Sequence, residues 1–141
     1  NNNGTLGATI DLINVLALQR EVLCYPSVSE TNLSWFYRNC ELVIFPSLYE
    51  GFGIPILEAT IYRKPLVVSD IPVFREILGN GGVFFSPLSI VELSRSLDRV
   101  SNLGVDSKAE LVRKASVACK GYFTSRAASR FYSQIIMDSR L

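Results

Sequence analysis

Residues 45–59 read Phe45-Pro46-Ser47-Leu48-Tyr49-Glu50-Gly51-Phe52-Gly53-Ile54-Pro55-Ile56-Leu57-Glu58-Ala59. The segment continues a short apolar run, 42–45, that predicts a buried strand. Residues 54–62 predict a helix, and Pro55 suits the first turn of that helix because proline at the start of a helix loses no hydrogen bond. We therefore expect a strand, a loop with two glycines and a helix in direct succession.

The same alternation continues on both sides of this segment. Further apolar runs predict strands at 22–25, 66–68 and 83–85. Amphipathic patterns predict helices at 6–18, from Ser29 as N-cap to near Asn39, at 72–78, and in two or three segments after Ser89 with breaks near 103–104 and at Gly121. Short apolar strands between such helices indicate an α/β protein with a parallel sheet and helices on both faces. We expect residues 1–141 to form a single domain.

Composition limits the classes of function. Hydrophobic residues make up 48% of the chain and the formal net charge is +1, which gives no electrostatic case for nucleic acid as a partner. No apolar run approaches the roughly 20 residues needed to span a bilayer. The three cysteines are widely spaced and the chain contains no histidine, so we expect neither a disulfide framework nor a metal site. A reducing cytoplasm fits this pattern.

Ligands of open parallel sheets bind beyond the carboxyl ends of the strands, in the loops that lead into the next helices. Four predicted loops lie there: 26–29, 46–53, 69–72 and 86–88. The loop 46–53 carries by far the most chemistry, because it combines glycines, a carboxylate and the start of a helix.

Gly51 and Gly53 allow a ligand to approach bare backbone, and the N-terminus of the helix that follows suits a phosphate. Glu50 precedes this helix, whereas Glu58 follows its first turn and leans back toward the helix start. Two carboxylates beside one anion site are better placed to accept hydrogen bonds from hydroxyl groups than to contact the phosphate. A sugar nucleotide has hydroxyls at both ends of a diphosphate. The structural alternative, in which the glycines only shape a turn and the glutamates only favour the helix dipole, stays open here.

Several segments in and around this loop resemble the signature of the large retaining glycosyltransferase family with two facing Rossmann-like domains, of the group 1 or family 4 type. The resemblance rests on two glutamates separated by seven residues and on the following residues and segments: Val28-Ser29 with Leu33 and Tyr37, Phe45-Pro46-Ser47, Tyr49-Glu50-Gly51-Phe52-Gly53-Ile54-Pro55, Leu57-Glu58-Ala59, Pro65-Leu66-Val67-Val68-Ser69-Asp70 and Arg75-Glu76-Ile77. It implies a Rossmann-like C-terminal domain that binds the nucleotide-sugar donor.

The resemblance implies a role for each matching residue. Glu58 would bind the ribose hydroxyls, and Glu50 would lie beside the donor sugar as the catalytic residue. Backbone N–H groups would line the sugar and the distal phosphate, namely those of Gly51, Phe52, Gly53 and Ile54. The loop after 22–25 would contact the base, although Pro26 stands where the family usually has glycine. The implied reaction transfers a hexose from a nucleoside diphosphate to an acceptor hydroxyl with retention, in polysaccharide biosynthesis, without a metal or a cofactor.

The positive charge that the leaving diphosphate needs has no obvious source. The family supplies it from an Arg and a Lys in the first strand–helix unit of this domain, and no version of that unit is recognisable here. Arg63 and Lys64 fall at the far end of the 54–62 helix, about 12–14 Å from its start. Arg75 follows a strand on the ligand side, and we expect it to be solvated.

The predicted topology also indicates an incomplete domain. In the common Rossmann sheet order 3-2-1-4-5-6, strands 2 and 1 lie between strand 3 and strand 4. If the strands at 22–25 and 42–45 are the third and the fourth, the two central strands are absent. The acceptor, a carbohydrate or a lipid-linked molecule, would bind a missing N-terminal domain. We therefore expect a truncated donor-binding domain that is inactive as an isolated chain.

The end of the chain is basic. Its charged residues are Arg113, Lys114, Lys120, Arg126, Arg130 and Arg140 against Asp138. Such a tail could favour an anionic membrane surface at the inner face of the membrane, where lipid-linked acceptors reside, although a solvated helix face explains it as well. Peripheral membrane contact is thus an open option for an otherwise cytoplasmic protein.

Two other functions stay open at the level of sequence. One is a binding module that keeps the nucleotide-sugar pocket without catalysing transfer. The other is a nucleotide-sugar epimerase, a class that shares the paired-domain architecture but typically uses a catalytic histidine, which this chain lacks. The motif around Glu50 and Glu58 favours the transferase and does not distinguish the nucleotide, the sugar or the acceptor.

Overall fold

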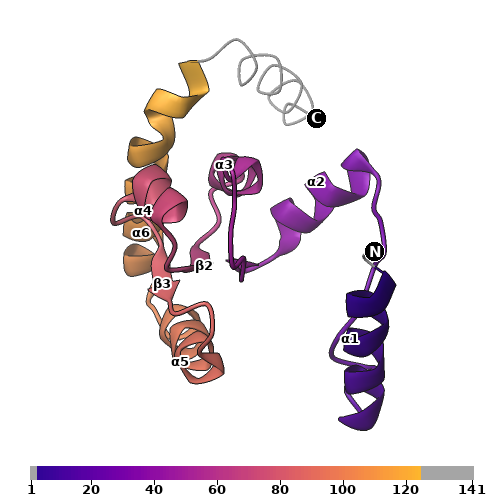
Figure 1. The fold of residues 1–141 in the computed structure, drawn as a ribbon. Coiled ribbons are helices and arrows are strands. Elements are labelled where there is room, and N and C mark those ends of the chain that lie inside the picture. Colours follow the sequence, from indigo (N-terminus) through magenta and orange to yellow (C-terminus); the bar gives the residue numbers. More distant parts are fainter. Residues whose placement is uncertain (1–2, 125–141) are drawn as a thin grey trace. The chain divides into compact units, whose positions relative to one another are not determined.

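The computed structural model describes residues 3–124 of the 141-residue chain. Its elements in chain order are α1 (Asn3–Val15), α2 (Glu30–Asn39), β1 (Val43–Phe45), α3 (Ile54–Ile61), β2 (Leu66–Ser69), α4 (Pro72–Leu78), β3 (Val83–Phe85), α5 (Ile90–Ser101), α6 (Val105–Cys119) and the 3-10 helix η1 (Lys120–Thr124) (Figure 1). The chain divides into two compact units, residues 1–36 and 37–141, and α2 crosses the boundary. A single domain over the whole chain stays a prediction.

In the first unit, α1 ends in a Schellman motif without glycine. Ala17 adopts the left-handed conformation (φ 55°), and its N–H donates to the Asn14 carbonyl at 3.1 Å. The Leu18 N–H donates to the Ile13 carbonyl at 2.9 Å. These two bonds satisfy carbonyls that the end of a helix would otherwise leave unpaired. The predicted helix at 6–18 is therefore confirmed, displaced by three residues toward the N-terminus.

The helix α2 begins after Ser29, as predicted. The Asn32 N–H donates to Ser29 Oγ at 3.2 Å, which is the side-chain bond of an N-cap. The strand predicted at 22–25 is wrong, because these residues form no strand. A strand exists only through ladder hydrogen bonds to a neighbour, and no described residue pairs with this segment. The Tyr25 ring instead packs on Phe36, with the centroids 5.4 Å apart.

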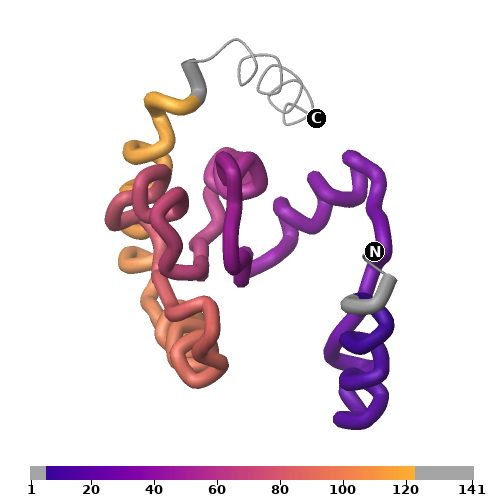
Figure 2. The backbone as a smooth tube through the Cα atoms, viewed as in Figure 1, coloured from indigo at the N-terminus to yellow at the C-terminus, as the bar shows by residue number. Residues whose placement is uncertain are grey.

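The second unit is built on three parallel strands in the order β1-β2-β3. Ile44 lies opposite Val67, and Val68 lies opposite Phe84. Figure 2 traces the chain from β1 through α3 to β2 and then through α4 to β3. Each strand lies where the sequence predicted it, because short, wholly apolar runs suit strands that are buried on both faces. The predicted α/β, Rossmann-like architecture is confirmed.

Alternate side chains of the strands enter two separate cores. One face of the sheet packs against α3, α4 and α6, and its buried residues include Leu66, Val68, Ile56, Phe74 and Ala115. The other face packs mainly against α5, and its core consists of Val67, Val83, Phe85 and Val100 with the partly buried Leu42, Leu93, Leu97 and Leu111. Helices therefore cover both faces of the sheet, as the sequence predicted.

The helix α6 lies directly on the turn that leads into β3. A Cβ atom at Gly81 would lie 2.2 Å from the Ala115 nitrogen and 2.3 Å from its Cα, so no side chain fits there. One turn further along α6, the buried Cys119 sulfur lies 3.7 Å from Thr60 Oγ1 on α3 and 3.7 Å from the Ile77 carbonyl oxygen on α4. These contacts join α6 to both helices of the larger core.

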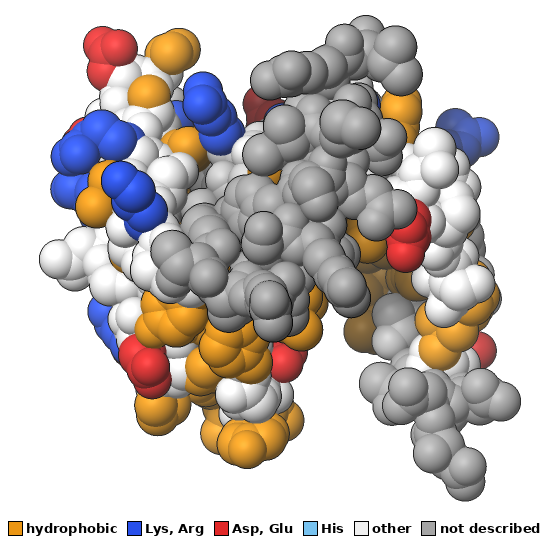
Figure 3. All heavy atoms as spheres, turned by 90° about the horizontal axis from the view of Figure 1, so that it is seen from above, with side chains coloured by type: hydrophobic (Ala, Val, Ile, Leu, Met, Phe, Trp, Pro, Cys, Tyr) orange, Lys and Arg blue, Asp and Glu red, His pale blue; other side chains and the backbone are white. Residues whose placement is uncertain are grey.

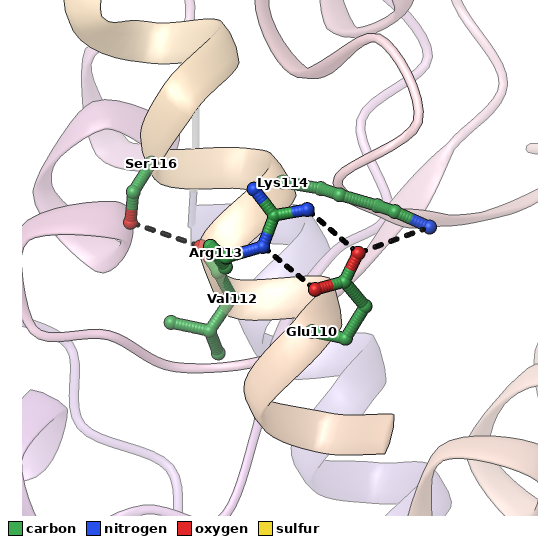
Figure 4. Close-up of polar contacts among 5 residues, drawn as sticks. All are labelled: Glu110, Val112, Arg113, Lys114 and Ser116. Carbon is green, nitrogen blue, oxygen red and sulfur yellow. Dashed lines mark hydrogen bonds and ion pairs between the residues drawn. The ribbon is translucent and has the colours of Figure 1, made fainter. Parts of the chain in front are cut away.

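The outer surface of α6 carries a small ion-pair cluster (Figure 4). Arg113 Nε and Nη2 donate to the two Glu110 carboxylate oxygens at 2.7 and 2.8 Å, and Lys114 Nζ lies 3.7 Å from Oε1. The hydrogen bonds from Arg113 are the main reason why the pKa of Glu110 falls to about 2. Glu110 thus balances part of the basic charge at the start of the tail. The remaining tail residues Arg126, Arg130, Asp138 and Arg140 lie outside the described residues.

The contact between Gly81 and α6 gives a stability prediction. Gly81→Ala is expected to lower the free energy of unfolding by about 2–4 kcal/mol, because the methyl group overlaps rigid helix backbone and not the end of a flexible side chain. Thermal unfolding followed by circular dichroism measures the effect. Gly104→Ser is the control, since a Cβ at Gly104 meets nothing within 4 Å. Equal unfolding temperatures for Gly81→Ala and the wild type would contradict the packing of α6 on this turn.

Candidate functional site

Three loops leave the carboxyl edge of the sheet in the second unit: 46–53 after β1, 70–71 after β2 and 86–89 after β3. Parallel strands place such loops at one edge, where α/β proteins bind ligands. The first of these loops leads directly into α3 (Figures 1 and 2). The fourth predicted loop, 26–29, belongs to the first unit and follows no strand.

The turn into α3 depends on Gly53. This residue is the N-cap of α3 and adopts the left-handed conformation with φ 74° and ψ 39°. Its carbonyl accepts from the Ile56 N–H at 3.0 Å, which starts the helix. A Cβ at this position would lie 3.2 Å from Ile77 Cδ1 and 3.4 Å from Phe74 Cε1, so α4 packs against the glycine from behind. Both the backbone conformation and the close packing therefore favour glycine here.

Glu50 is held by a residue of its own loop. The Ser47 hydroxyl donates to Glu50 Oε1 at 2.8 Å, and the glutamate is partly buried. A short bond between neighbours in one loop restricts the rotamers of a side chain that would otherwise move freely. The carboxylate is therefore held immediately before Gly51, at the point where the loop turns toward α3.

Glu58 is held by a residue from another helix. The Tyr37 hydroxyl of α2 lies 3.3 Å from Glu58 Oε2 and 3.5 Å from the Pro55 carbonyl oxygen. Tyr37 is 8% exposed as a whole residue, and its ring stacks on that of Tyr62, with centroids 5.2 Å apart and planes 13° from parallel. Burial, and next the negative charge of Glu58, raise the pKa of Tyr37 far above its ordinary value. This phenol therefore stays protonated and acts as a hydrogen-bond donor.

Between Glu50 and Glu58, the polar groups that the chain can present to a ligand belong mainly to the backbone. The side chains of Phe52 and Ile54 are apolar and about half exposed (49% and 56%), so their N–H groups are the polar atoms that they can present to a ligand. The Phe52 ring meets Tyr122 of η1 edge-on at 5.9 Å, and the Tyr122 hydroxyl donates to Glu76 of α4 at 3.3 Å. In the view from above, hydrophobic side chains reach the surface in several places (Figure 3).

The loop after β2 carries a fixed ion pair. Arg75 Nε and Nη2 donate to the two Asp70 carboxylate oxygens at 2.6 and 2.7 Å. The guanidinium carbon also lies 3.8 Å from the centroid of the Phe84 ring. Arg75 is half exposed, as expected for a solvated side chain, but it is bound on two sides. This arrangement makes it a brace between α4, the β2 loop and β3.

Lys64 has a structural role at the opposite end of α3. Its ammonium group donates to the carbonyl oxygens of Arg38 and Cys40 at 2.7 and 2.8 Å, which fastens the end of α2. Arg63 adopts the left-handed conformation (φ 54°) that closes α3 in a second Schellman motif, with the Lys64 N–H bonded to the Ala59 carbonyl at 3.3 Å. Both residues therefore lie away from the start of α3, as the sequence predicted.

The structure thus brings most of the predicted residues into one loop–helix unit. Gly51, Phe52, Gly53 and Ile54 form the turn into α3, and Glu50 and Glu58 stand before and after it. Ser47 and Tyr37 belong to the residues that resemble the family, but their contacts with the two carboxylates were not predicted, and the aromatic neighbour Tyr122 was missed. Ser47 could have been found from its spacing to Glu50. The partners from other elements leave no signal in a single sequence.

Residues 3–124 contain no cluster of metal ligands and no membrane-spanning helix. No group of three or more His, Cys, Asp or Glu side chains within this range could hold a metal ion. Within the same range no helix has the length and apolarity needed to cross a membrane. The cysteines are free thiols, of which Cys24 is exposed and Cys119 is buried.

The sequence matches a known family over most of its length. Residues 8–117 match the glycosyl transferases group 1. This region covers well over half of the chain, so the protein belongs to that family, and the resemblance inferred from the motif around Glu50 and Glu58 is confirmed.

Three of the similar relatives are named as mannosyltransferases. The chain is 42% identical over 72 residues to the O-antigen chain mannosyltransferase RfbU of Salmonella typhimurium. The matched region covers 51% of this chain and 20% of that protein. It is 31% identical over 91 residues to the O-antigen chain mannosyltransferase B of Escherichia coli, and this match covers 64% of the present chain and 23% of the relative. It is 32% identical over 110 residues to the MMP alpha-(1->4)-mannosyltransferase of Mycolicibacterium hassiacum, and this match covers 76% of the present chain and 26% of the relative. The chain therefore spans about a quarter or less of the length of these relatives.

Solved structures share the fold. The alpha,alpha-trehalose-phosphate synthase (UDP-forming) from Burkholderia vietnamiensis superposes with a TM-score of 0.65 at 15% identity, over 79% of this chain and 26% of that one. The N-terminal domain of Candida albicans trehalose-6-phosphate phosphatase gives a TM-score of 0.65 at 18% identity, over 79% and 24%. At these identities the likeness shows the fold alone.

The brace between Asp70 and Arg75 gives a prediction for the pH dependence of stability. The hydrogen bond from Arg75 lowers the pKa of Asp70, so the contribution of the pair is complete above the ordinary carboxyl range near pH 4 and is lost as pH falls through the lowered pKa. Asp70→Asn is expected to reduce stability at pH 7 by up to about 1 kcal/mol, because the pair is half exposed. The difference from wild type should be smaller at about pH 2 than at pH 7, because Asp70 becomes protonated as the pH falls toward its lowered pKa.

Thermal unfolding at the two pH values measures this difference. Arg75→Lys is the matched variant, because lysine keeps the charge but loses the paired hydrogen bonds and the planar contact with Phe84. A difference between wild type and Asp70→Asn that is as large in acid as at neutral pH would contradict the prediction.

Proposed function

We propose that this chain is the donor-binding part of a glycosyltransferase that transfers a hexose from a nucleoside diphosphate to an acceptor hydroxyl with retention of configuration. The observation that carries the proposal is the loop–helix unit from Glu50 to Glu58. In it, two carboxylates, each held by a hydroxyl donor, stand before and after a left-handed glycine turn at a helix start. The chain belongs to a family of glycosyl transferases, and this unit is its most specific feature.

The proposed position of the diphosphate of the nucleotide sugar follows from charge. The start of α3 presents N–H groups without intrahelical partners and the positive end of the helix dipole, so the distal phosphate is placed there. Carboxylates repel phosphate and accept from hydroxyls, so both glutamates are proposed to bind hydroxyl groups. The family resemblance implies which ones: the ribose hydroxyls for Glu58 and those of the donor sugar for Glu50. The N–H groups of Gly51, Phe52, Gly53 and Ile54 line the sugar and the phosphate. The proposal includes no metal and no cofactor beyond the sugar nucleotide itself.

The proposed role of Glu50 is electrostatic. Cleavage of the bond between sugar and diphosphate develops positive charge on the sugar ring, and a carboxylate held in place beside the ring stabilises that charge without reorganisation. The bond from Ser47 supplies the restraint that such preorganisation needs. Three similar relatives are named as mannosyltransferases, which makes a mannosyl donor the first candidate among hexoses.

The proposal assigns the remaining functions to further polypeptide. Arg75 is bound to Asp70, and Lys64 lies at the other end of α3. The charge that stabilises the leaving diphosphate is therefore proposed to come from outside the described residues. Acceptor binding belongs to the same missing part, since the chain spans about a quarter or less of its relatives. The isolated chain is accordingly expected to be inactive, and contact of the basic tail with a membrane surface belongs to the intact enzyme.

Donor binding is tested by calorimetric titration with UDP, GDP and ADP. We expect one nucleotide to bind selectively and Glu58→Gln to weaken it by about 1–3 kcal/mol, because a charged hydrogen-bond acceptor for the ribose is lost. Glu110→Gln is the matched control, since this glutamate pairs only with basic side chains on α6 in the contacts described above. If Glu110→Gln weakens binding as much as Glu58→Gln, the ribose assignment is wrong.

Catalysis is tested in the intact enzyme with the donor that binds. Glu50→Ala is expected to lower kcat by a factor of about 10²–10³, because the carboxylate acts on charge that develops in the transition state. Ser47→Ala should lower kcat less, since it loosens the carboxylate without removing it. Full activity of Glu50→Ala would contradict the assignment of Glu50 as the catalytic residue. Selective nucleotide binding without any transfer by the wild type would favour a binding module.

A further inference from the structure

The contacts of Tyr37 go beyond what packing of α2 requires. Its ring is buried and stacked on Tyr62, and its hydroxyl ends between the Glu58 carboxylate and the Pro55 carbonyl, both on α3. The hydroxyl has a single proton to donate. The charged acceptor lies nearer, at 3.3 Å against 3.5 Å, and charge-assisted hydrogen bonds are the stronger kind. The bond to Glu58 is therefore the favoured one.

We propose that Tyr37 is a positioning residue whose hydroxyl orients the Glu58 carboxylate toward the ribose of a bound nucleotide. The inference rests on the proposed function, in which Glu58 binds the ribose, and it adds the residue that prepares Glu58 for that task.

The hydroxyl is well suited to this role because the end of α2 is fixed to α3 at three points. The rings of Tyr37 and Tyr62 stack, the Arg38 guanidinium lies over the Tyr62 ring at 6.0 Å, and Lys64 Nζ bonds the carbonyl oxygens of Arg38 and Cys40. A phenol anchored in this way has little conformational freedom. A glutamate side chain has several rotatable bonds, and restricting Glu58 in the free protein removes an entropic cost that a nucleotide would otherwise bear on binding.

The chemistry of the phenol matches the same role. The pKa of Tyr37 is raised by burial and by Glu58, so its hydroxyl stays neutral throughout the physiological range and cannot bring a second negative charge to the site. A neutral donor leaves Glu58 as a carboxylate that accepts hydrogen bonds, which is the form that binds hydroxyl groups. Lysine in the same place would instead neutralise the carboxylate and compete with the ribose.

The test compares ribonucleotides with deoxyribonucleotides. Tyr37→Phe keeps the stacked ring and removes only the hydroxyl. Calorimetry measures the affinities of UDP, GDP and ADP and of their 2′-deoxy and 3′-deoxy counterparts for the wild type, Tyr37→Phe, Glu58→Gln and the double variant. We expect Tyr37→Phe to reduce the preference for the ribonucleotide by about three- to tenfold. The affinity for the deoxynucleotide that lacks the hydroxyl contacted by Glu58 should be nearly the same for Tyr37→Phe and the wild type.

Two comparisons separate positioning from packing. In the double variant, the loss of ribose preference should equal that of Glu58→Gln alone, because Tyr37 acts only through Glu58. Tyr62→Phe, which removes the hydroxyl of the other ring in the stack, should keep the full preference. A purely structural role would weaken the ribo and deoxy forms equally in Tyr37→Phe, and this result would overturn the inference.

The outcomes also separate this inference from the proposed function. If Glu58→Gln reduces the ribose preference but Tyr37→Phe does not, only the role of Tyr37 is wrong. If Glu58→Gln leaves the preference unchanged, or if no nucleotide binds the wild type, the ribose site itself is wrong and the inference fails with it.

Discussion

The left-handed turn at Gly53 is the constraint on which the rest of the site depends. It turns the chain that leaves β1 into α3 with a backbone conformation that side chains rarely adopt, and Phe74 and Ile77 of α4 pack where a Cβ would stand. The direction of α3 is therefore fixed at its first residue. Because the helix direction is fixed, its positive end faces the carboxyl edge of the sheet, and Glu58 one turn later leans back toward that same end.

The two carboxylates are restrained by different means. Glu50 bonds to Ser47 within one loop, so its position follows the conformation of that loop alone. Glu58 bonds to Tyr37, so its position depends on the contacts that hold residues 37–40 against the end of α3. The basic residues at the ends of α3 and α4 serve the scaffold, since Lys64 fastens α2 and Arg75 binds Asp70. The carboxylates of the loop–helix unit and these two cations therefore serve different parts of the second unit.

Most elements could be predicted because their signals are local. Apolar runs of three or four residues gave β1, β2 and β3, and the hydroxyl of Ser29 marked the start of α2. The strand predicted at 22–25 failed for a physical reason, since strands are stabilised by neighbours and none of the described residues pairs with this segment. Helix ends were less predictable. Ala17 and Arg63 close Schellman motifs without the glycine that normally signals them.

The sequence by itself determined the fold class, the family and the six residues of the candidate site, Glu50, Gly51, Phe52, Gly53, Ile54 and Glu58. The first five are contiguous and Glu58 follows Ile54 by about one helical turn, so short spacings along the chain already bring them close together. The tertiary structure alone decided which side chains hold them. Tyr37 meets Glu58, Tyr122 meets Phe52, and Arg75 meets Phe84 only after separate elements have packed together. Such contacts join residues that are distant in sequence, and the positions of their partners are fixed by the packing of both cores.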